Sequence, residues 1–386
     1  MGGLEEVYVI EALRSPIGKR NGLLSGLHAQ HLLAQVLQKT VEKSGIDPAS
    51  TDHFIAGCVD QIGEQGANVA RNSWLTAGFA ETVPATTIDR QCGSSLQAVQ
   101  FAYGEIASGV ADLEICAGIE SMSRVPMFSN IKDGATGTPI TPEIRSRYSL
   151  EGEWFSQARA ASLISEKYGI SRTRMDEFSM ESHMRASRSR KFADREKVPI
   201  NTGREIISID EGIRDSVSLE KMGSLKPAFP GIDHITAGNS SQISDGASAC
   251  VLASKSIVDS MGLKPIARLV SFGYAAVDPI IMLTGVIPAT KMALSRAGLK
   301  KDDIDIFEVN EAFASVPLAW EKELGVENDI VNPMGGAIAL GHPLGATGTR
   351  IVSTLINGLH TLGGKRGLIA VCEGGGLSNA CVIEKV

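Results

Sequence analysis

Short apolar runs alternate with segments of helical periodicity along the first part of the chain. The apolar runs predict four buried strands, at Val7–Ile10, Phe54–Val59, Ala85–Ile88 and Leu113–Gly118. From His28 to Ser44, apolar residues recur every three or four positions, which predicts an amphipathic helix that ends at Gly45. A second helix is expected directly after Cys92. This order of strands and helices is typical of a doubly wound α/β layer.

The last third of the chain repeats this order. Strands are predicted at Ile266–Val270, Ile304–Val309 and Gly367–Cys372, and helices at 288–298 and 345–362. The segment that starts at Asp52 resembles the one that starts at Asp305, and the segment from Ala111 resembles the one from Arg366. The sequence therefore predicts a duplicated α/β architecture.

The middle of the chain, from about Glu120 to Gln242, has a different composition. Gly, Pro, Ser, Arg and other charged residues dominate it, and helical pieces are predicted only near Gln157–Tyr168 and Arg174–Phe192. Insertions of this length usually carry binding functions. We expect this segment to cover a binding site.

Composition narrows the class of protein. Hydrophobic residues make up 43% and charged residues 21% of the 386 residues, as in a soluble globular protein of two or three subdomains. The net charge of −7 argues against nucleic-acid binding, which normally needs a basic surplus. No apolar run approaches the ~20 residues of a membrane-spanning helix, and neither a secretory nor a peroxisomal signal is recognised. A cytoplasmic location is expected.

The six cysteines stand at positions 58, 92, 116, 250, 372 and 381, and no two of them form a C-x-x-C pair. Their spacing predicts neither a zinc site nor a disulfide framework, so no metal is expected. Free thiols fit a reducing compartment.

Cys92 is the strongest candidate for a chemical role. It stands between the predicted strand Ala85–Ile88 and the helix that opens near Gly93. At such a turn, backbone N–H groups converge and the helix dipole is positive. The sequence therefore predicts that Cys92 is a thiolate nucleophile.

His342 and Cys372 are the candidate partners of this nucleophile. His342 lies in a glycine-rich stretch that lets the backbone approach a ligand closely. An isolated histidine is more often structural, but with a suitable cysteine in the chain it is expected to take the proton from Cys92. Cys372 could be a small buried hydrophobe or could move a proton. The glycines that follow, from Gly374, offer bare N–H groups for an oxyanion hole.

Three further features are weaker candidates. Asn310 follows a predicted strand, where its amide could cap the next helix, orient a water molecule or carbonyl, or do both. The small-residue run from Thr236 to Gly246 suits either a narrow tunnel for a pantetheine-like arm or an ordinary helix-capping loop. Arg214 is a plausible phosphate partner, although a single arginine is more often a surface charge.

With these motifs in place, the chain resembles the thiolases from Val7 to Val386. The resemblance rests on six motifs in order: Arg90-Gln-Cys-Gly-Ser-Ser, Glu120-Ser-Met-Ser, Thr236-Ala-Gly-Asn, Asn310-Glu-Ala-Phe-Ala, Gly335-Gly-Ala-Ile-Ala-Leu-Gly-His-Pro and Cys372-Glu-Gly-Gly-Gly. It implies two α/β halves that form a five-layered α-β-α-β-α core, one of residues 1–119 completed by about 243–265, the other of residues 266–386. A loop domain of residues 120–242 would cover the coenzyme A site.

The resemblance also implies a function. The chain would transfer an acyl group between coenzyme A and acetyl-CoA through a thioester on Cys92, without a tightly bound cofactor, as a homodimer or homotetramer. His342 would activate Cys92, and Cys372 would deprotonate the acetyl methyl group or protonate the departing enolate. Asn310 would hold a water molecule that, with His342, binds one thioester oxygen.

The remaining roles implied by the resemblance concern binding. The N–H groups of Cys92 and Gly374 would bind the other thioester oxygen. Ser241 and Arg214 match positions that contact coenzyme A.

Departures from the family pattern bear on the substrate. Ser156-Gln157 stands where short-chain acetoacetyl thiolases carry His-Met, and Glu373 stands where many thiolases have an apolar residue. The stretches 14–22 and 240–246 are similar to thiolases of bacterial steroid catabolism. These features favour a degradative thiolase with an acyl group larger than acetoacetyl.

Three other functions were weighed. A biosynthetic thiolase that condenses two acetyl-CoA molecules would use the same residues. A non-catalytic acyl or lipid carrier would need none of Cys92, His342 and Cys372. A ketoacyl synthase would pair its cysteine with His-His or His-Asn, whereas this chain carries the Cys372-Glu-Gly-Gly-Gly segment.

Overall fold

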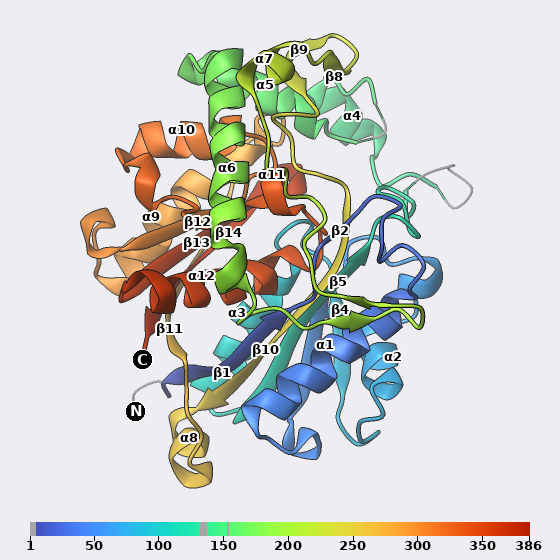
Figure 1. Ribbon diagram of the computed structural model, residues 1–386, viewed down its shortest axis with the longest axis vertical. Coiled ribbons are helices and arrows are strands. Elements are labelled where there is room, and N and C mark those ends of the chain that lie inside the picture. The colour runs from blue at the N-terminus through green and yellow to red at the C-terminus, as the bar shows by residue number, and fades with distance from the viewer. Residues whose placement is uncertain (1–4, 132–136, 153) are drawn as a thin grey trace.

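A computed structural model describes residues 5–131, 137–152 and 154–386 (Figure 1). The first four residues, which bear on the expectation about a secretory signal, lie outside this description, as do six residues of the expected loop domain. No helix in the described ranges is long and apolar enough to cross a membrane.

One mixed β-sheet runs through the molecule, in the strand order β12-β13-β14-β11-β1-β10-β5-β3-β4, with β2 paired to β10. Its strands are β1 (Val7–Arg14), β2 (Gly18–Lys19), β3 (His53–Gly57), β4 (Ala85–Ile88), β5 (Leu113–Ser121), β10 (Ser244–Ser254), β11 (Ala267–Ala276), β12 (Ile306–Val309), β13 (Arg366–Cys372) and β14 (Leu377–Lys385). The predicted strands are all present, although β1, β5 and β11 are longer than expected and β12 is shorter.

The sheet consists of two halves with the same connectivity. In the first half, β1–β10 and β10–β5 are antiparallel, while β5–β3 and β3–β4 are parallel. In the second half, β11–β14 and β14–β13 are antiparallel, β13–β12 is parallel, and a single parallel bridge, Phe307↔Val331, stands where β4 would lie. The halves meet where Tyr8 and Val9 of β1 pair with β11. The predicted duplication is confirmed.

The two halves also share a hydrogen-bonding detail that the sequence comparison pointed to. Asp52 accepts hydrogen bonds from the backbone N–H groups of residues 112 and 113, both through Oδ2. Asp305 does the same for residues 365 and 366. Each aspartate therefore ties the start of one strand to the start of its parallel neighbour.

Helices form three layers around the two half-sheets. The central layer is α3 (Ser94–Ala107) with α12 (Thr347–Leu362), and their apolar side chains share one core cluster with strands of both halves. Outer helices α1 (Ala29–Ser44) and α2 (Val69–Thr76) pack on the first half. Outer helices α9 (Val286–Ala297) and α10 (Ser315–Leu324) pack on the second. These layers form the predicted five-layered core (Figure 1).

Two predicted helix ends are confirmed, and at each of them a glycine adopts a left-handed conformation. Gly45 ends α1 with φ 74°, and its N–H donates to the carbonyl of Val41. Gly298 ends α9 with φ 66°. Since a side chain at such φ values is strained, glycine at these positions stops the helix and lets the chain turn into the next strand.

The insertion between β5 and β10 contains four helices and two small hairpins in its described residues. They are α4 (Pro142–Tyr148), α5 (Gln157–Tyr168), α6 (Arg172–Ala193), α7 (Leu219–Gly223), β6 (Ile200–Asn201) with β7 (Ile206–Ile207), and β8 (Pro227–Phe229) with β9 (Ile232–Thr236). In Figure 1, α4, α5, α7 and the β8–β9 hairpin gather at the top of the molecule, and α6 runs from this group toward α12. The remaining short helices are α8 (Lys255–Met261), after β10, and α11 (Ala337–Leu340), before α12.

The run from Thr236 to Gly246 is only partly a loop. Thr236 ends β9, and the last three residues of the run form the start of β10. All eleven residues of β10 are buried, and most are small. Small residues are needed there because the strand lies in the middle of the sheet with layers on both of its faces.

A buried ion-pair network fixes the chain that follows α6 to β1. The guanidinium of Arg14 donates to Glu196 over 2.6 Å and to both oxygens of Asp210 over 2.6 and 3.0 Å. Burial alone would raise the pKa of Asp210, but the charge of Arg14 outweighs it and holds this pKa below its ordinary value. The network links the insertion to the core.

Candidate active site

Four predicted site residues lie at the ends of elements that meet in the middle of the molecule. Asn310 directly follows β12, and Cys372 is the last residue of β13. Because β12 and β13 are parallel neighbours, the carboxyl ends of the two strands lie together. Cys92 precedes α3 and His342 lies in the loop before α12, and these two helices form the central layer. The duplicated topology therefore brings together four positions that are far apart in the sequence. Cys92 and Cys372, the most distant two, are separated by 280 residues.

The turn that carries Cys92 is held by local contacts. Gln91 has a left-handed backbone with φ 49°, which is unfavourable for a residue with a side chain. The hydroxyl of Ser94 accepts from the N–H of Arg90 over 2.8 Å and donates to the carbonyl of Gln91 over 2.6 Å. These bonds fix the sharp turn that places Cys92 two residues before the start of α3, next to its N-cap Gly93.

The prediction that Cys92 is a thiolate is wrong for the free protein. Burial, the neighbouring Cys372 and the carboxylate of Glu373 all raise the pKa of Cys92, well above its ordinary value. Only 3% of the residue is exposed, so the desolvation that disfavours a charged sulfur exceeds the benefit of the helix N-terminus. Cys92 is a thiol until a base removes its proton.

His342 is held in the tautomer that such a base requires. Its Nδ1 lies 2.6 Å from the hydroxyl of Thr347, and that hydroxyl donates its only proton to the carbonyl of Pro343 over 2.8 Å. The Thr347 oxygen must therefore accept from Nδ1–H, which leaves Nε2 as the free lone pair. Burial and the charge of Arg350 lower the pKa of His342 to about 3, so the imidazole is neutral.

Asn310 links the histidine to the second cysteine. Its Nδ2 lies 3.4 Å from Nε2 of His342 and 3.9 Å from Sγ of Cys372. Its Oδ1 is buried and has no hydrogen-bond partner among the described residues. Burial raises the pKa of Cys372 to about 12, although the Asn310 amide opposes this shift. Cys372 is therefore also a protonated thiol, with an amide oxygen nearby that still needs a donor.

Among the described residues, two backbone N–H groups on the loops that carry Cys92 and Cys372 have no internal acceptor. Within the described ranges, neither the N–H of Cys92 nor that of Gly374 donates to an oxygen of another residue. Gly374 also packs tightly, since a Cβ there would lie 2.8 Å from Oε1 of Gln91. Free N–H groups at such a turn can bind developing negative charge on oxygen.

Glu373 joins the two cysteine-bearing loops. Its Oε2 accepts from Nε of Arg90 over 2.9 Å, while its Oε1 has no partner among the described residues. Burial raises the pKa of Glu373 to about 8 in spite of Arg90. Sequence reasoning noticed Glu373 as a departure but missed its pairing with Arg90 and the role of Thr347. The position of Thr347 in the first turn after the histidine loop was the available signal.

The two predicted coenzyme A contacts lie apart from each other. Ser241 is half-buried beside the Asn310 loop, and its N–H donates to the carbonyl of Ala312 over 2.9 Å. Arg214 is exposed, and in the described part of the chain its guanidinium has no ion-pair partner. Its backbone N–H donates to Nδ1 of His183 over 3.2 Å. Ser241 therefore lies beside the loop that carries Asn310, whereas no hydrogen bond or ion pair joins the Arg214 side chain to that loop among the described residues.

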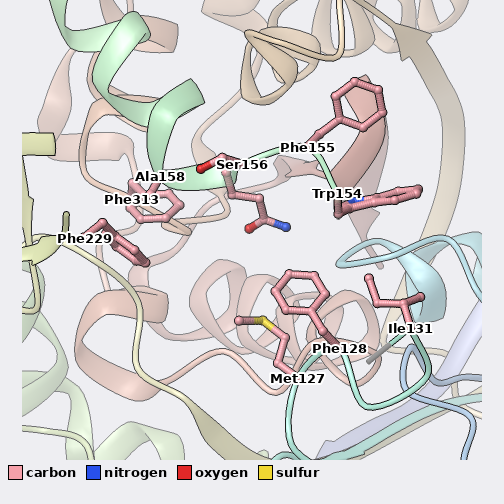
Figure 2. Close-up of a pocket in the computed structure, with 10 residues that line it drawn as sticks. Met127, Phe128, Ile131, Trp154, Phe155, Ser156, Ala158, Phe229 and Phe313 are labelled. Carbon is pink, nitrogen blue, oxygen red and sulfur yellow. The ribbon is translucent and has the colours of Figure 1, made fainter. Parts of the chain in front are cut away.

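An apolar cavity of about 290 Å³ opens next to the Asn310 loop (Figure 2). Figure 2 shows aromatic rings around it from the insertion and from that loop. The lining residues are Met127, Phe128, Ile131, Trp154, Phe155, Ser156, Gln157, Ala158, Phe229 and Phe313. Ser156-Gln157, the pair that departs from the short-chain thiolases, therefore lines this cavity.

Two thiols, a neutral histidine and unpaired N–H donors lie at the junction of a duplicated α/β fold, an arrangement that suits acyl transfer through sulfur. The comparisons with known proteins agree with this class. The thiolase N-terminal domain family matches residues 7–256, and the thiolase C-terminal domain family matches residues 263–385. The chain belongs to the thiolase family and is an acyltransferase.

Individual relatives cover nearly the whole chain. The chain is 45% identical to the steroid 3-ketoacyl-CoA thiolase FadA6 of Mycobacterium tuberculosis, over 99% of this chain and 95% of that protein. It is 39% identical to the beta-ketoadipyl-CoA thiolase of Pseudomonas aeruginosa, over 99% of each. Among solved structures, human mitochondrial 3-ketoacyl-CoA thiolase in complex with CoA is similar with a TM-score of 0.91 and 34% identity, covering 100% of this chain and 99% of that one.

Proposed function

We propose that this chain degrades 3-oxoacyl-CoA thioesters, using coenzyme A to release acetyl-CoA and an acyl-CoA shortened by two carbons. The observation that carries the proposal is the arrangement of Cys92, His342, Asn310 and Cys372, in which Thr347 leaves the imidazole Nε2 free. The similarity to 3-ketoacyl-CoA thiolases supports the degradative direction.

In the first half-reaction, His342 Nε2 takes the proton of Cys92 and the sulfur forms a bond to the 3-oxo carbon. The bond between carbons 2 and 3 then breaks, and its electron pair stays on carbon 2 as the enolate of acetyl-CoA. Cys372 gives this carbon its proton, and acetyl-CoA leaves. The acyl group remains on Cys92 as a thioester.

In the second half-reaction, the Cys372 thiolate takes the proton of the incoming coenzyme A. The new thiolate attacks the acyl carbon, the bond to Cys92 breaks, and the Cys92 sulfur recovers its proton from His342. Each oxyanion would be held by one pair of donors: the N–H groups of Cys92 and Gly374, or His342 with a water molecule on the unpaired Oδ1 of Asn310. Each such donor is worth on the order of 10²-fold in rate.

The first test changes Cys92 to Ala. This variant should lose thiolysis entirely and should not incorporate an acyl label, because Cys92 is the sulfur that the mechanism acylates. Changing Cys372 to Ala should lower kcat by ~10²–10⁴-fold, the usual worth of a general acid or base. Retained thiolysis in Cys92→Ala would end the proposal.

We further propose an acyl group larger than acetoacetyl. The 290 Å³ cavity beside the Asn310 loop has an apolar, aromatic lining, and Ser156-Gln157 leave it open. A thiolysis screen over 3-oxoacyl-CoA length and branching tests this. A strong preference for acetoacetyl-CoA would instead favour biosynthetic condensation of two acetyl-CoA molecules.

The remaining proposals concern binding and assembly. The insertion, residues 120–242, would cover the coenzyme A site, with Ser241 and Arg214 in contact with the coenzyme, and no tightly bound cofactor would take part. We propose a cytoplasmic homodimer or homotetramer that binds neither nucleic acid nor membrane. The open edge strand β4 offers unpaired backbone groups for such an assembly. Light scattering during size-exclusion chromatography measures the assembly directly, and a monomer would contradict it.

A further inference from the structure

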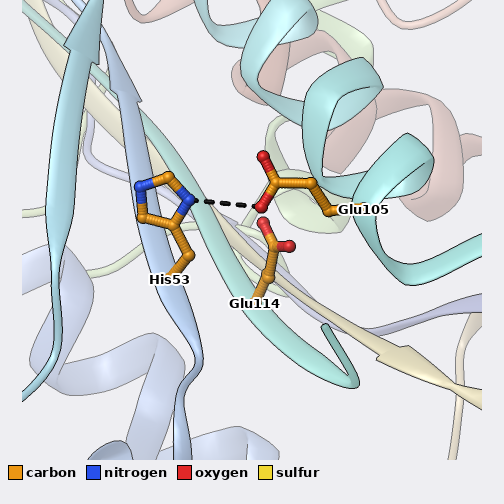
Figure 3. A group of neighbouring side chains, drawn as sticks. All are labelled: His53, Glu105 and Glu114. Atoms are coloured by element: carbon orange, nitrogen blue, oxygen red, sulfur yellow. Dashed lines mark hydrogen bonds and ion pairs between the residues drawn. The ribbon is translucent and has the colours of Figure 1, made fainter. Parts of the chain in front are cut away.

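Three side chains with metal-binding atoms meet far from the catalytic cluster (Figure 3). His53 comes from β3, Glu105 from the last turn of α3 and Glu114 from β5. His53 Nδ1 lies 3.3 Å from Glu105 Oε2, and the ligand atoms of all three lie within 4.8 Å of one another. Glu105 is eleven residues along α3 from Ser94, so about 16 Å of helix separates this group from the turn at Cys92.

Glu114 supplies the observation that points to a ligand. The residue is fully buried, and neither of its carboxylate oxygens has a hydrogen-bond partner among the described residues. Figure 3 shows this carboxylate beside the carboxylate of Glu105 and near the ring of His53. A buried charge without a partner costs several kcal/mol or more, so two adjacent carboxylates need either a proton or a cation between them.

The surroundings of His53 suit a cation. Its Nε2 lies 3.1 Å from the hydroxyl of Thr86. If Nε2–H donates to that hydroxyl, Nδ1 presents a bare lone pair to the Glu105 oxygen, and the two would repel without a positive charge between them. Metal-binding histidines usually donate their second ring N–H to a neighbour in this way.

We propose that His53, Glu105 and Glu114 bind one divalent cation of the zinc type. One imidazole nitrogen and two carboxylate oxygens are ligands that Zn²⁺ accepts, and water would complete a four-coordinate site. The ion would connect the carboxyl end of α3 to β3 and β5, and so would stabilise the first half of the core. The site uses no cysteine, so the cysteine spacing says nothing about it, and its role is independent of the proposed thiolysis.

Diffraction from crystals of the full chain grown with Zn²⁺ tests the location. Data at the zinc absorption edge should give an anomalous peak between the three side chains, with metal–ligand distances of about 2.0–2.2 Å. A peak only at Cys92, Cys372 or His342, or no peak, would overturn the proposal. The second result would mean that Glu105 and Glu114 share a proton instead.

Calorimetric titration of metal-free protein with Zn²⁺ tests the ligands. It is best done in a Cys92→Ser background, because the catalytic thiols also attract zinc. Glu114→Gln and His53→Gln should each weaken binding by roughly tenfold or more. Glu42→Gln, an exposed glutamate on α1, should bind as the parent does.

Two features keep this test decisive. Glu114→Gln replaces a buried carboxyl by an amide of the same shape, so this variant should fold. If Glu114→Gln fails to fold, His53→Gln still provides the test, because it changes a residue that is only half-buried. Zn²⁺ should raise the thermal unfolding temperature of the Cys92→Ser parent but not of either variant. Equal affinity for Zn²⁺ and an equal rise in unfolding temperature in the parent and both variants would refute the site.

Discussion

Cys92 shows how burial decides the chemistry of a residue. Its position before a helix suggested a thiolate, but its environment keeps the proton on sulfur, and Cys372 and Glu373 reinforce this. In the free protein the raised pKa keeps this sulfur protonated, and we expect it to become a nucleophile when His342 takes its proton.

The rate of alkylation of Cys92 by iodoacetamide tests this state. Because the pKa of Cys92 is raised, the thiolate fraction should rise by about tenfold per pH unit from pH 6 to 9 without a plateau. Above its pKa of about 8, Glu373 carries a negative charge beside the sulfur, so Glu373→Gln should speed alkylation at the alkaline end of this range. A plateau below pH 8, or slower alkylation of Glu373→Gln, would contradict the assignment.

Thr347 is expected to act through His342. Changing Thr347 to Val removes the oxygen that accepts Nδ1–H, so the imidazole loses its fixed tautomer, and kcat should fall by about tenfold or more with little change in KM. Thr349→Val is the matched control. Thr349 lies on the same helix as Thr347, but its hydroxyl lies 2.6 Å from that of Ser248 and does not contact the histidine. Equal losses in both variants would indicate a purely structural role.

At the scale of elements, the sequence predicts the helices whose apolar residues recur periodically, and it misses a strand that consists of small residues. The helices 157–168 and 28–44 are read correctly because their apolar spacing and glycine stops are strong local signals. Strands β10 and β14 are not predicted. β10 consists mostly of Ala, Ser and Gly, which look like a turn in sequence, and only the layers on both of its faces explain them.

The candidate site divides in the same way. His342 and Cys372 can be found from glycine-rich motifs, because such motifs mark places where the backbone approaches a ligand, whereas Cys92 and Asn310 can be found from their positions after predicted strands. The Arg90–Glu373 pair joins positions that are 283 residues apart, so no local pattern could reveal it, and the protonation state of Cys92 depends on the same contact. The Thr347–His342 bond joins positions only five residues apart, and the place of Thr347 in the first turn of α12 was its available signal.

The ion-pair network of Arg14 should matter for stability because the insertion depends on it. Asp210→Asn leaves Arg14 partly uncompensated in a buried site and should lower the free energy of unfolding by about 3 kcal/mol. Urea denaturation measures this. Asp194→Asn removes the ion pair that the exposed Asp194 makes with Lys197 in the same segment and should have a much smaller effect.

The pH dependence of this difference follows from the lowered pKa of Asp210. The stability that Asp210 contributes is present above its ordinary unfolded pKa of about 4 and is lost as the pH falls through the lower folded value. The difference between the parent and Asp210→Asn should therefore shrink as the pH falls below about 4. A difference that grows in acid would contradict the network.

At the scale of the whole molecule, the insertion meets the duplicated core where the acyl cavity opens. Trp154 from the insertion lines that cavity and also a larger polar one of about 780 Å³ beyond it. Trp154→Ala should lower kcat/KM for the preferred long acyl chain by roughly tenfold and leave acetoacetyl-CoA thiolysis unchanged as an internal control. Equal losses for both substrates would show that the cavity does not select the acyl chain.

The central claim is that the duplicated core assembles a thiol that becomes acylated. The direct measurement is mass spectrometry of the protein after brief incubation with a 3-oxoacyl-CoA in the absence of free coenzyme A. The peptide that contains Cys92 should gain the mass of the shortened acyl group, acetyl-CoA should appear in equal amount, and added coenzyme A should remove the group. Acylation of another residue, or turnover with Cys92 never modified, would contradict the account.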